Sequence, residues 1–147
     1  MTVNYTDEDL QNHDAVAAVI QDAKGNILMQ EHVKYGFWTI PIGKAASGQT
    51  PIEAMKEEVL EECDIIVQEF EEVAQKKYEY DRNGKQVKLL LHIYKVIKYS
   101  GKISNKEPHK HSKQEFKSVE QIKNIPHLGD ATLLYLETLG IKRPTHL

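Results

Sequence analysis

The chain has 147 residues, a net charge of −3, 40% hydrophobic residues and 28% charged residues. This composition is typical of a soluble globular protein and excludes an intrinsically disordered chain. The longest apolar run, from Ala15 to Ile20, has six residues, whereas a helix that crosses a bilayer needs about 20. We therefore exclude membrane insertion and expect a single domain over residues 1–147.

The first eleven residues and the cysteine content indicate the compartment. The chain begins with an acidic, polar stretch, and Cys63 is its only cysteine. A secretory signal starts with basic residues and continues with an apolar segment, so secretion is not expected. One cysteine excludes an internal disulfide and a thiolate metal cluster. The sequence predicts a cytoplasmic protein in which Cys63 fills space near a helix end.

The first part of the chain predicts two strands joined by a turn. Residues 13–21 contain the apolar run VAAVI, and residues 27–33 (ILMQEHV) contain another. Between them, residues 22–26 (DAKGN) carry the Asp, Gly and Asn that are typical of turns. We expect a hairpin, then a short strand or loop at 36–41 and a Gly- and Ala-containing loop at 43–49.

The strongest local signals predict a helix over residues 50–63. Thr50 is expected as the N-cap, Pro51 stands at the first helical position, and Glu53 completes a capping box. At 100° per residue, a single stripe holds the apolar residues of this helix, namely Ile52, Met55, Val59 and Cys63. We expect this stripe to pack against the rest of the protein.

A long hairpin is predicted after the helix. Alternating apolar residues at 66–80 and 87–97 are typical of strands, and Asn83 and Gly84 between them favour a tight turn.

The remaining third of the chain predicts a loop and a closing helix. Residues 104–118 are polar and are expected to form an irregular loop. A helix is predicted over 131–139, with Asp130 as its N-cap. The order of strands and helices indicates a mixed α/β fold.

Charge is unevenly distributed along the chain. Residues 50–64 contain six carboxylates and one lysine, whereas residues 76–123 contain thirteen Lys and Arg against five Asp and Glu. One interpretation is that an acidic segment and a basic half together hold a metal ion and a polyanion. The alternative is an ordinary surface of mixed charge.

Three glutamates of the predicted helix form an acidic face. Glu58, Glu61 and Glu62 stand at i, i+3 and i+4, which places their carboxylates within about 100° of one another, beside the apolar stripe. Like charges at this spacing destabilise a helix, and the helix dipole disfavours anions near its C-terminal end. A divalent ion removes both conflicts, and hard carboxylate oxygens suit Mg²⁺, Mn²⁺ or Ca²⁺. The alternative is a solvated, glutamate-rich surface.

The segment from 43 to 65, GKAASGQTPIEAMKEEVLEECDI, resembles the signature of the Nudix hydrolases (MutT-like enzymes). That signature is G, five residues, E, seven residues, then R-E-U-x-E-E-x-G-U, where U is a bulky aliphatic residue. With Gly43 at the first position, six of its nine specified positions agree, the other five being Glu58, Val59, Glu61, Glu62 and Ile65. The WTIP sequence before the loop and the stretch from Glu115 to Glu120 are also similar to the family.

Three positions depart from the signature. Gln49 replaces a glutamate, Glu57 replaces an arginine, and Asp64 replaces the glycine that ends the helix. Asp64 can adopt the left-handed conformation, although at a cost that glycine avoids. None of the three removes the acidic face.

The resemblance implies the fold and the site. The fold would be an αβα sandwich with a mixed β-sheet between helices, carrying the loop-helix motif at 43–65. Glu58, Glu61 and Glu62 would bind metal and act in catalysis, and the backbone oxygen of Gly43 would be a further ligand. The cofactor would be Mg²⁺, with Mn²⁺ as a substitute, and the partner a nucleotide or nucleoside-diphosphate-linked small molecule.

The resemblance leaves the general base and the substrate contacts open. The base would be Glu61 or Glu62, or a loop acid such as Glu107 or Glu115. Several basic residues are available to hold phosphates: Lys76, Lys77, Lys88, Lys106, Lys110 and Lys113. Four aromatic residues are candidates for stacking a base, although each also suits packing: Phe37, Trp38, Tyr78 and Tyr80.

The histidines are assigned no chemical role. We expect His109, His111 and His127 to be solvated loop residues, because their spacing fits no metal-ligand pattern. His92, in a predicted strand, is expected to be structural.

Three functions are compatible with these features of the sequence. The first is a divalent-metal-dependent hydrolase that cleaves a phosphoanhydride bond in a nucleoside di- or triphosphate or a nucleoside diphosphate linked to another group. The second is a nucleotide- or metabolite-binding regulatory module with weakened catalysis, suggested by Gln49 and Glu57. The third and weakest is nucleic-acid binding through the basic half, which predicts steep salt dependence. The sequence leaves the oligomeric state open, a homodimer included.

Overall fold

The computed structural model describes residues 12–145. The acidic first eleven residues, which bear on the secretion prediction, lie outside this range. None of the helices between residues 12 and 145 combines the length and the apolar character that a membrane span requires.

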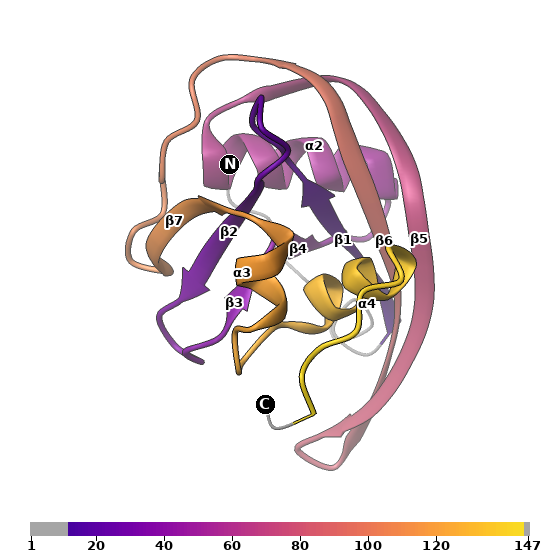
Figure 1. Cartoon of the computed structure of the whole chain (residues 1–147). Helices are drawn as coiled ribbons and strands as arrows, with labels where there is room; N and C mark the ends of the chain where they lie inside the picture. Colours follow the sequence, from indigo (N-terminus) through magenta and orange to yellow (C-terminus); the bar gives the residue numbers. More distant parts are fainter. Residues whose placement is uncertain (1–11, 146–147) are drawn as a thin grey trace.

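A four-stranded mixed sheet forms the centre of the fold (Figure 1). Its order is β4-β1-β6-β5, and its strands are β1 (Asn12–Val19), β4 (Ile42–Lys44), β5 (Ile66–Arg82) and β6 (Lys85–Ser100). Strand β1 pairs in parallel with β6 and antiparallel with β4. A parallel pair needs a crossover connection, and the chain between β1 and β6 includes the helix that carries the acidic face.

A second, antiparallel sheet has the order β3-β2-β7. It contains β2 (Ile27–His32), β3 (Trp38–Thr39) and β7 (His111–Lys117). The predicted hairpin of residues 13–21 with 27–33 is therefore wrong, because β1 and β2 belong to different sheets. Gln21, which follows β1, forms an isolated bridge with Ile27 at the start of β2. Periodicity could not reveal this, because a strand that is buried on both faces shows a continuous apolar run whatever its partner.

Helix α2 (Pro51–Cys63) begins as the sequence predicts. The Thr50 side chain accepts a hydrogen bond from the Glu53 backbone N–H, and Glu53 returns one to the Thr50 backbone, so the capping box is complete. At the other end Asp64 adopts the left-handed conformation with φ of 62°. The buried side differs from the predicted stripe, because Ile52 is exposed and Glu62 is buried. The helix thus turns one of its three acidic residues into the protein.

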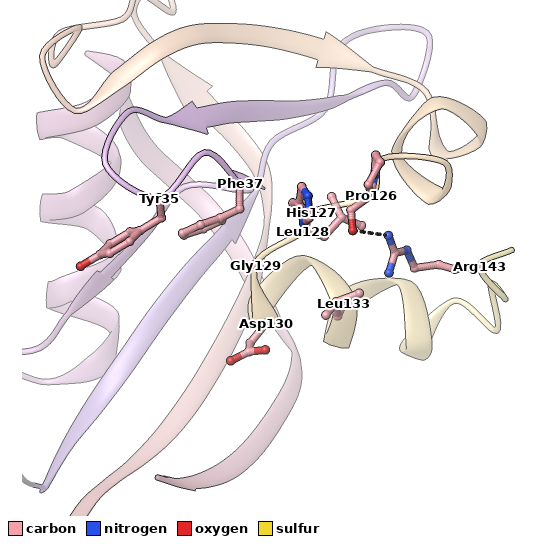
Figure 2. Close-up of a pocket in the computed structure, with 9 residues that line it drawn as sticks. All are labelled: Tyr35, Phe37, Pro126, His127, Leu128, Gly129, Asp130, Leu133 and Arg143. Atoms are coloured by element: carbon pink, nitrogen blue, oxygen red, sulfur yellow. Dashed lines mark hydrogen bonds between the residues drawn. The ribbon is translucent and has the colours of Figure 1, made fainter. Parts of the chain in front are cut away.

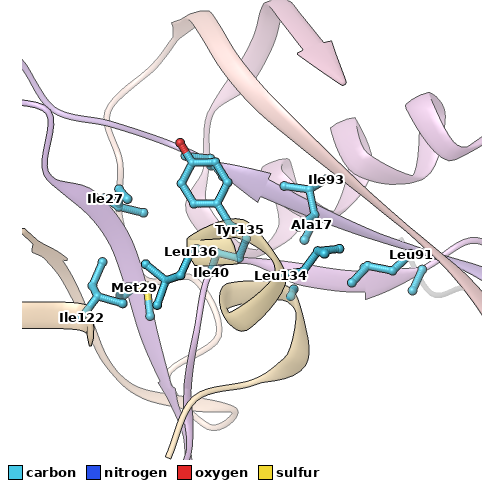
Figure 3. Close-up of a cluster of buried hydrophobic side chains, with 13 residues drawn as sticks. Ala17, Ile27, Met29, Ile40, Leu91, Ile93, Ile122, Leu134, Tyr135 and Leu136 are labelled. Atoms are coloured by element: carbon cyan, nitrogen blue, oxygen red, sulfur yellow. The ribbon is translucent and has the colours of Figure 1, made fainter. Parts of the chain in front are cut away.

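Helices cover the two faces of the central sheet (Figure 1). Val16 and Ala18 of β1 belong to the apolar cluster that includes α2, whereas Ala17 and Val19 belong to the cluster that includes α4 (Asp130–Thr138). Figure 3 shows the second cluster, in which side chains from α4 meet those from the sheets. The alternation along β1 places a helix on each face, which confirms the predicted mixed α/β fold.

The long hairpin of β5 and β6 is confirmed, with Asn83 and Gly84 both at positive φ (51° and 79°) in its turn. Such φ values are those of the two-residue turns that match strand twist.

The predicted loop at 104–118 is corrected by the structure, since its second half forms strand β7. The inward-facing residues of this strand include the polar residues His111 and Gln114. The strand therefore lacks the alternation of apolar and polar residues by which it could be predicted from the sequence. A short helix, α3 (Val119–Lys123), follows with Ser118 as its N-cap. Helix α4 starts one residue before the prediction, with Gly129 rather than Asp130 as its N-cap.

Candidate active site

Glu58 of α2 lies directly against Gly43 of β4. A methyl group added to Gly43 would overlap the Glu58 side chain, so only glycine allows the strand and the carboxyl group to be this close. Gly43 is held in register by pairing with Val16 of β1. Gly43 and Glu58, both predicted site residues, are therefore brought together where α2 packs on β4.

Glu62 is the most deeply buried of the acidic residues, with 3% of its surface exposed. Its Oε1 atom accepts a hydrogen bond from Gln30 Nε2 at 3.2 Å and lies 3.3 Å from His111 Nε2. Gln114 donates to Gln30 Oε1 at 2.9 Å and to the Glu62 backbone oxygen at 3.3 Å. Residues of β2 and β7 thus fix one carboxylate oxygen of Glu62. The other, Oε2, is buried and receives no hydrogen bond from an N–H group in the part of the chain that the structure describes, although the carboxyl groups of Glu62 and Glu58 share a hydrogen bond.

The acidic residues raise one another's pKa values. Burial, followed by the Glu61 and Glu107 carboxylates, raises the pKa of Glu58 to about 7. Burial and then Glu58 raise the pKa of Glu62 well above its usual value. Burial and the neighbouring Glu57 raise the pKa of Glu61. Crowded carboxylates of this kind favour binding of a cation, which stabilises their charged forms.

A turn from outside the motif brings Glu107 to the same cluster. The backbone carbonyl oxygen of Glu107 accepts hydrogen bonds from the backbone N–H groups of Lys110 and His111, both at 2.9 Å. One oxygen from each of Glu62 and Glu107 and one nitrogen of His111 all lie within 4.8 Å of one another. Glu107 therefore joins the site, whereas Glu115 pairs with Lys117 on an exposed part of β7. Of the two loop acids considered, only Glu107 is placed in the cluster.

His111 corrects the prediction of a solvated loop histidine. It is 3% exposed, and burial followed by the nearby His32 lowers the pKa of its ring to about 4. At neutral pH the ring is uncharged, so its contact with Glu62 is not an ion pair. The signal that sequence reasoning missed is the spacing of Glu107 and His111, four residues apart, which a helical turn places on one side.

Two of the three departures from the signature contact each other. Gln49 Nε2 donates to Glu57 Oε2 at 2.6 Å, and Gln49 Oε1 accepts from the Ala46 backbone N–H at 3.0 Å. A neutral amide and a carboxylate thus connect the loop to α2 where the signature has a carboxylate and a guanidinium. The loop closes with a hydrogen bond in place of an ion pair.

A cavity of about 510 Å³ lies beyond the ends of β2 and β3 (Figure 2). Tyr35 and Phe37 form one wall, with ring centroids 5.9 Å apart. Asp130 and Arg143 also line the cavity, and Figure 2 shows Arg143 directed at the Pro126 backbone oxygen, to which its Nη2 donates at 3.3 Å. The cavity therefore combines an aromatic wall with charged groups of both signs.

A row of rings connects this cavity to the acidic cluster. His32 stacks on Phe37 with centroids 5.4 Å apart and on Tyr35 at 4.9 Å, and it meets His111 edge-on at 5.8 Å. His111 in turn contacts Glu62. The acidic cluster and the cavity are thus linked by side chains in direct succession. Phe37 was a predicted stacking candidate, whereas His32 and Tyr35 were not identified from the sequence.

The other predicted contacts divide between the site and the rest of the molecule. Lys110 lies at the acidic cluster, 3.3 Å from Glu107; burial alone would lower the pKa of its amine, but the Glu107 carboxylate raises it. Lys106 pairs with Asp64 at the end of α2. Of the aromatic candidates, Phe37 lines the cavity, whereas Trp38 and Tyr78 pack against the core and Tyr80 is exposed.

Two further side chains agree with their predicted structural roles. Cys63 is fully buried in the cluster beneath α2. His92 is buried between Asp14 of β1, at 3.0 Å, and Glu72 of β5, at 2.9 Å, so it links three strands.

Comparison with known proteins identifies the family. The NUDIX domain family model matches residues 11–135. The chain belongs to the Nudix family. No curated protein matches it with significance. Membership of the family supports a pyrophosphohydrolase in general terms, and Nudix enzymes generally use divalent metals.

Solved structures of Nudix proteins have the same fold. A MutT NUDIX hydrolase from Burkholderia pseudomallei is 22% identical with a TM-score of 0.75, over 88% of this chain and 98% of that one. The E. coli ORF135 protein is 24% identical with a TM-score of 0.70, over 89% and 90%. A C. elegans Ap4A hydrolase is 17% identical with a TM-score of 0.61, over 88% and 96%. At these identities the likeness establishes the fold alone.

Proposed function

We propose that this Nudix protein is a divalent-metal-dependent hydrolase that cleaves a phosphoanhydride bond in a nucleoside di- or triphosphate or in a nucleoside diphosphate linked to another group. The observation that carries the proposal is the buried Glu62 carboxyl group, whose Oε2 meets no N–H donor from residues 12–145 and which lies against the carboxyl group of Glu58. Burial and crowding favour the protonated forms of such carboxyl groups, and a bound cation would stabilise their charged forms. The residues present thus fit the divalent ion that the family uses.

The ligands of the ion would be Glu58, Glu61, Glu62 and the backbone oxygen of Gly43. Hard oxygen donors suit Mg²⁺, with Mn²⁺ as a substitute. A divalent ion at this position supplies charge stabilisation for phosphate oxygens and lowers the pKa of a bound water. Glu61, which is less buried than Glu62, would accept the proton of the attacking water. Its raised pKa supports this role, because a base works best when its pKa lies nearer the operating pH.

The cavity beside Tyr35 and Phe37 would hold the nucleoside. Aromatic rings stack on nucleobases, and each such contact contributes about 1–3 kcal/mol. Asp130 would accept hydrogen bonds from base N–H groups, and Lys110, beside the acidic cluster, would contact phosphate oxygens. We also propose that residues 1–147 act as one domain, because α2 and α4 pack on opposite faces of the same strand.

A substrate screen tests the hydrolase proposal. Release of phosphate or pyrophosphate is measured for nucleoside di- and triphosphates, dinucleoside polyphosphates and nucleoside diphosphate sugars, each with Mg²⁺, Mn²⁺ or EDTA. We expect metal-dependent turnover of at least one class, and a loss of about 10²–10⁴-fold in kcat for Glu61→Gln. Glu137→Gln, an exposed glutamate of α4, is the matched control and should retain activity. Absence of turnover with every compound and both metals contradicts the proposal.

The hydrogen bond between Gln49 and Glu57 favours a second function, a nucleotide-binding module with weakened catalysis. It holds the loop in place without the ionic groups of the signature, so binding can persist where turnover is reduced. Calorimetry that detects nucleotide binding, beside undetectable hydrolysis, would support this function. Recovery of turnover in a Gln49→Glu, Glu57→Arg double variant would identify the pair as the cause.

A further inference from the structure

The turn that carries Glu107 and His111 is held in a fixed conformation. The backbone carbonyl oxygen of Glu107 accepts two hydrogen bonds, from the backbone N–H groups of Lys110 and His111, and these close one helical turn. Asn105 secures it from both ends: its Nδ2 donates to the His111 backbone oxygen at 2.8 Å, and its Oδ1 accepts from the Glu107 backbone N–H at 3.3 Å. The four-residue spacing then places both side chains on one side of the turn. Glu107 and His111 are therefore presented together to α2.

The three side chains at this point are spaced like ligands of one ion. His111 Nε2 lies 3.3 Å from Glu62 Oε1, and the donor atoms of Glu62, Glu107 and His111 are all within 4.8 Å of one another. Metal bonds of about 2.1 Å place neighbouring ligand atoms roughly 3 Å apart and opposite ones roughly 4 Å apart. The 3.3 Å contact agrees with neighbouring ligands, and the limit of 4.8 Å is slightly wider than opposite ligands require, so binding would draw the side chains closer together.

Hydrogen bonding within the protein does not satisfy the group. Glu62 is buried, and within residues 12–145 no N–H group reaches its Oε2. Its carboxyl group instead shares a hydrogen bond with that of Glu58 and is repelled by that of Glu107. The Lys110 ammonium lies 3.3 Å from Glu107 Oε2, so this nearby cation is paired with Glu107. A buried carboxyl group with the His111 ring at one oxygen and other carboxyl groups around it indicates a place for a cation.

We propose that His111 is a nitrogen ligand at this site and that, through it, the protein prefers a first-row transition-metal ion such as Mn²⁺ to Mg²⁺. The inference rests in part on the proposed function, because Glu62 belongs to both ligand sets. Carboxylates alone favour Mg²⁺, Ca²⁺ and Mn²⁺ with little discrimination, whereas an imidazole nitrogen favours transition metals. His111, which would set this preference, and its neighbour Glu107 both lie outside the motif at 43–65.

Electron paramagnetic resonance of the Mn²⁺-loaded protein tests the nitrogen ligand directly. In the wild type without nucleotide, we expect electron spin-echo modulation from one directly bound ¹⁴N. His111→Gln should lose this modulation. His109→Gln, which changes an exposed histidine of the same loop, is the matched control and should retain it. Absence of ¹⁴N modulation in the wild type overturns the proposal, and this measurement needs no variant to fold.

Metal affinities separate a ligand from a residue that only positions Glu62. Mn²⁺ binding is titrated from the signal of the free ion, and Mg²⁺ binding from its competition with Mn²⁺. We expect His111→Gln to weaken Mn²⁺ binding by at least about tenfold and Mg²⁺ binding by less than about threefold. An equal loss for both ions would show that His111 acts only through its contact with Glu62, which overturns the proposal.

The outcome is distinguishable from that of the hydrolase proposal. Both measurements use the protein without a substrate, so failure to hydrolyse any nucleotide leaves them unchanged. Conversely, Mg²⁺-dependent hydrolysis with no nitrogen coupling would refute the role of His111 and leave the hydrolase proposal intact.

Discussion

Replacing Glu58 with Gln should stabilise the metal-free protein at alkaline pH. Burial and the surrounding carboxylates raise the pKa of Glu58 from 4.5 to about 7. Between these two values the folded state binds more protons than the unfolded state, so the free energy of unfolding falls as the pH rises. Above pH 7 the folded protein bears the whole free-energy penalty of ionising Glu58. The difference from 4.5 to about 7, at 1.36 kcal/mol per pH unit, corresponds to at most about 3 kcal/mol.

Urea denaturation in EDTA at pH 5 and pH 8 measures this penalty. At pH 8 we expect Glu58→Gln to exceed the wild type by about 1–3 kcal/mol in free energy of unfolding, with an unchanged m value. At pH 5, where Glu58 is mostly protonated, the difference should shrink below about 1 kcal/mol. Glu137→Gln is the control and should follow the wild type at both pH values. Saturating Mn²⁺ at pH 8 should stabilise the wild type more than Glu58→Gln.

The reasoning is refuted if Glu58→Gln is no more stable than the wild type at pH 8. It is also refuted if the gain is equal at pH 5 and pH 8, because a gain that does not depend on pH would come from packing and not from charge.

Three further changes test the site and the sheet. Gly43→Ala should weaken Mn²⁺ binding by at least about tenfold with unchanged far-UV circular dichroism, since the added methyl would displace Glu58; unaltered affinity would contradict this. Gln49→Glu should lower the free energy of unfolding, measured by urea denaturation at pH 8, by about 1–2 kcal/mol, because it replaces the hydrogen bond to Glu57 with two facing carboxylates. Adding Glu57→Arg should restore this stability. If the effects of the two substitutions simply add, the two side chains are not directly coupled. His92→Gln should lower the free energy of unfolding at pH 6, again measured with urea, by about 1–3 kcal/mol, because the His92 ring contacts two carboxylates. Equal stability of variant and wild type would show that these contacts contribute nothing.

Several local patterns in the sequence were reliable because the contacts that decide them are close along the chain. The Thr50 and Glu53 capping box joins residues three apart, and the Asn83-Gly84 turn needs only its own backbone conformation. The acidic face of α2 likewise follows from the helical period. These features were therefore predictable from short windows of sequence.

Tertiary contacts decided the part of the site that the sequence did not reveal. Glu62 was expected beside the apolar stripe, yet it is buried because Gln30 of β2 and Gln114 of β7 form a polar environment for it. His111 was expected in solvent, yet β7 turns it inward to Glu62. Polar residues that face inward give no hydrophobic signal, so neither the strand nor its role could be read from periodicity.

By itself the sequence determined the helix, its caps, the spacing of its three glutamates and the resemblance to the Nudix hydrolases, because each depends on residues within one short segment. Only the tertiary structure decided that Gly43 contacts Glu58 and that Glu107 and His111 complete the cluster. It also formed the cavity beside Tyr35 and Phe37. The physical reason is sequence separation: Glu107 and His111 belong to a segment far along the chain from α2, and strand pairing and helix packing alone bring them together. Gly43 and Glu58 lie in one motif, but only the packing of α2 on β4 decides their contact.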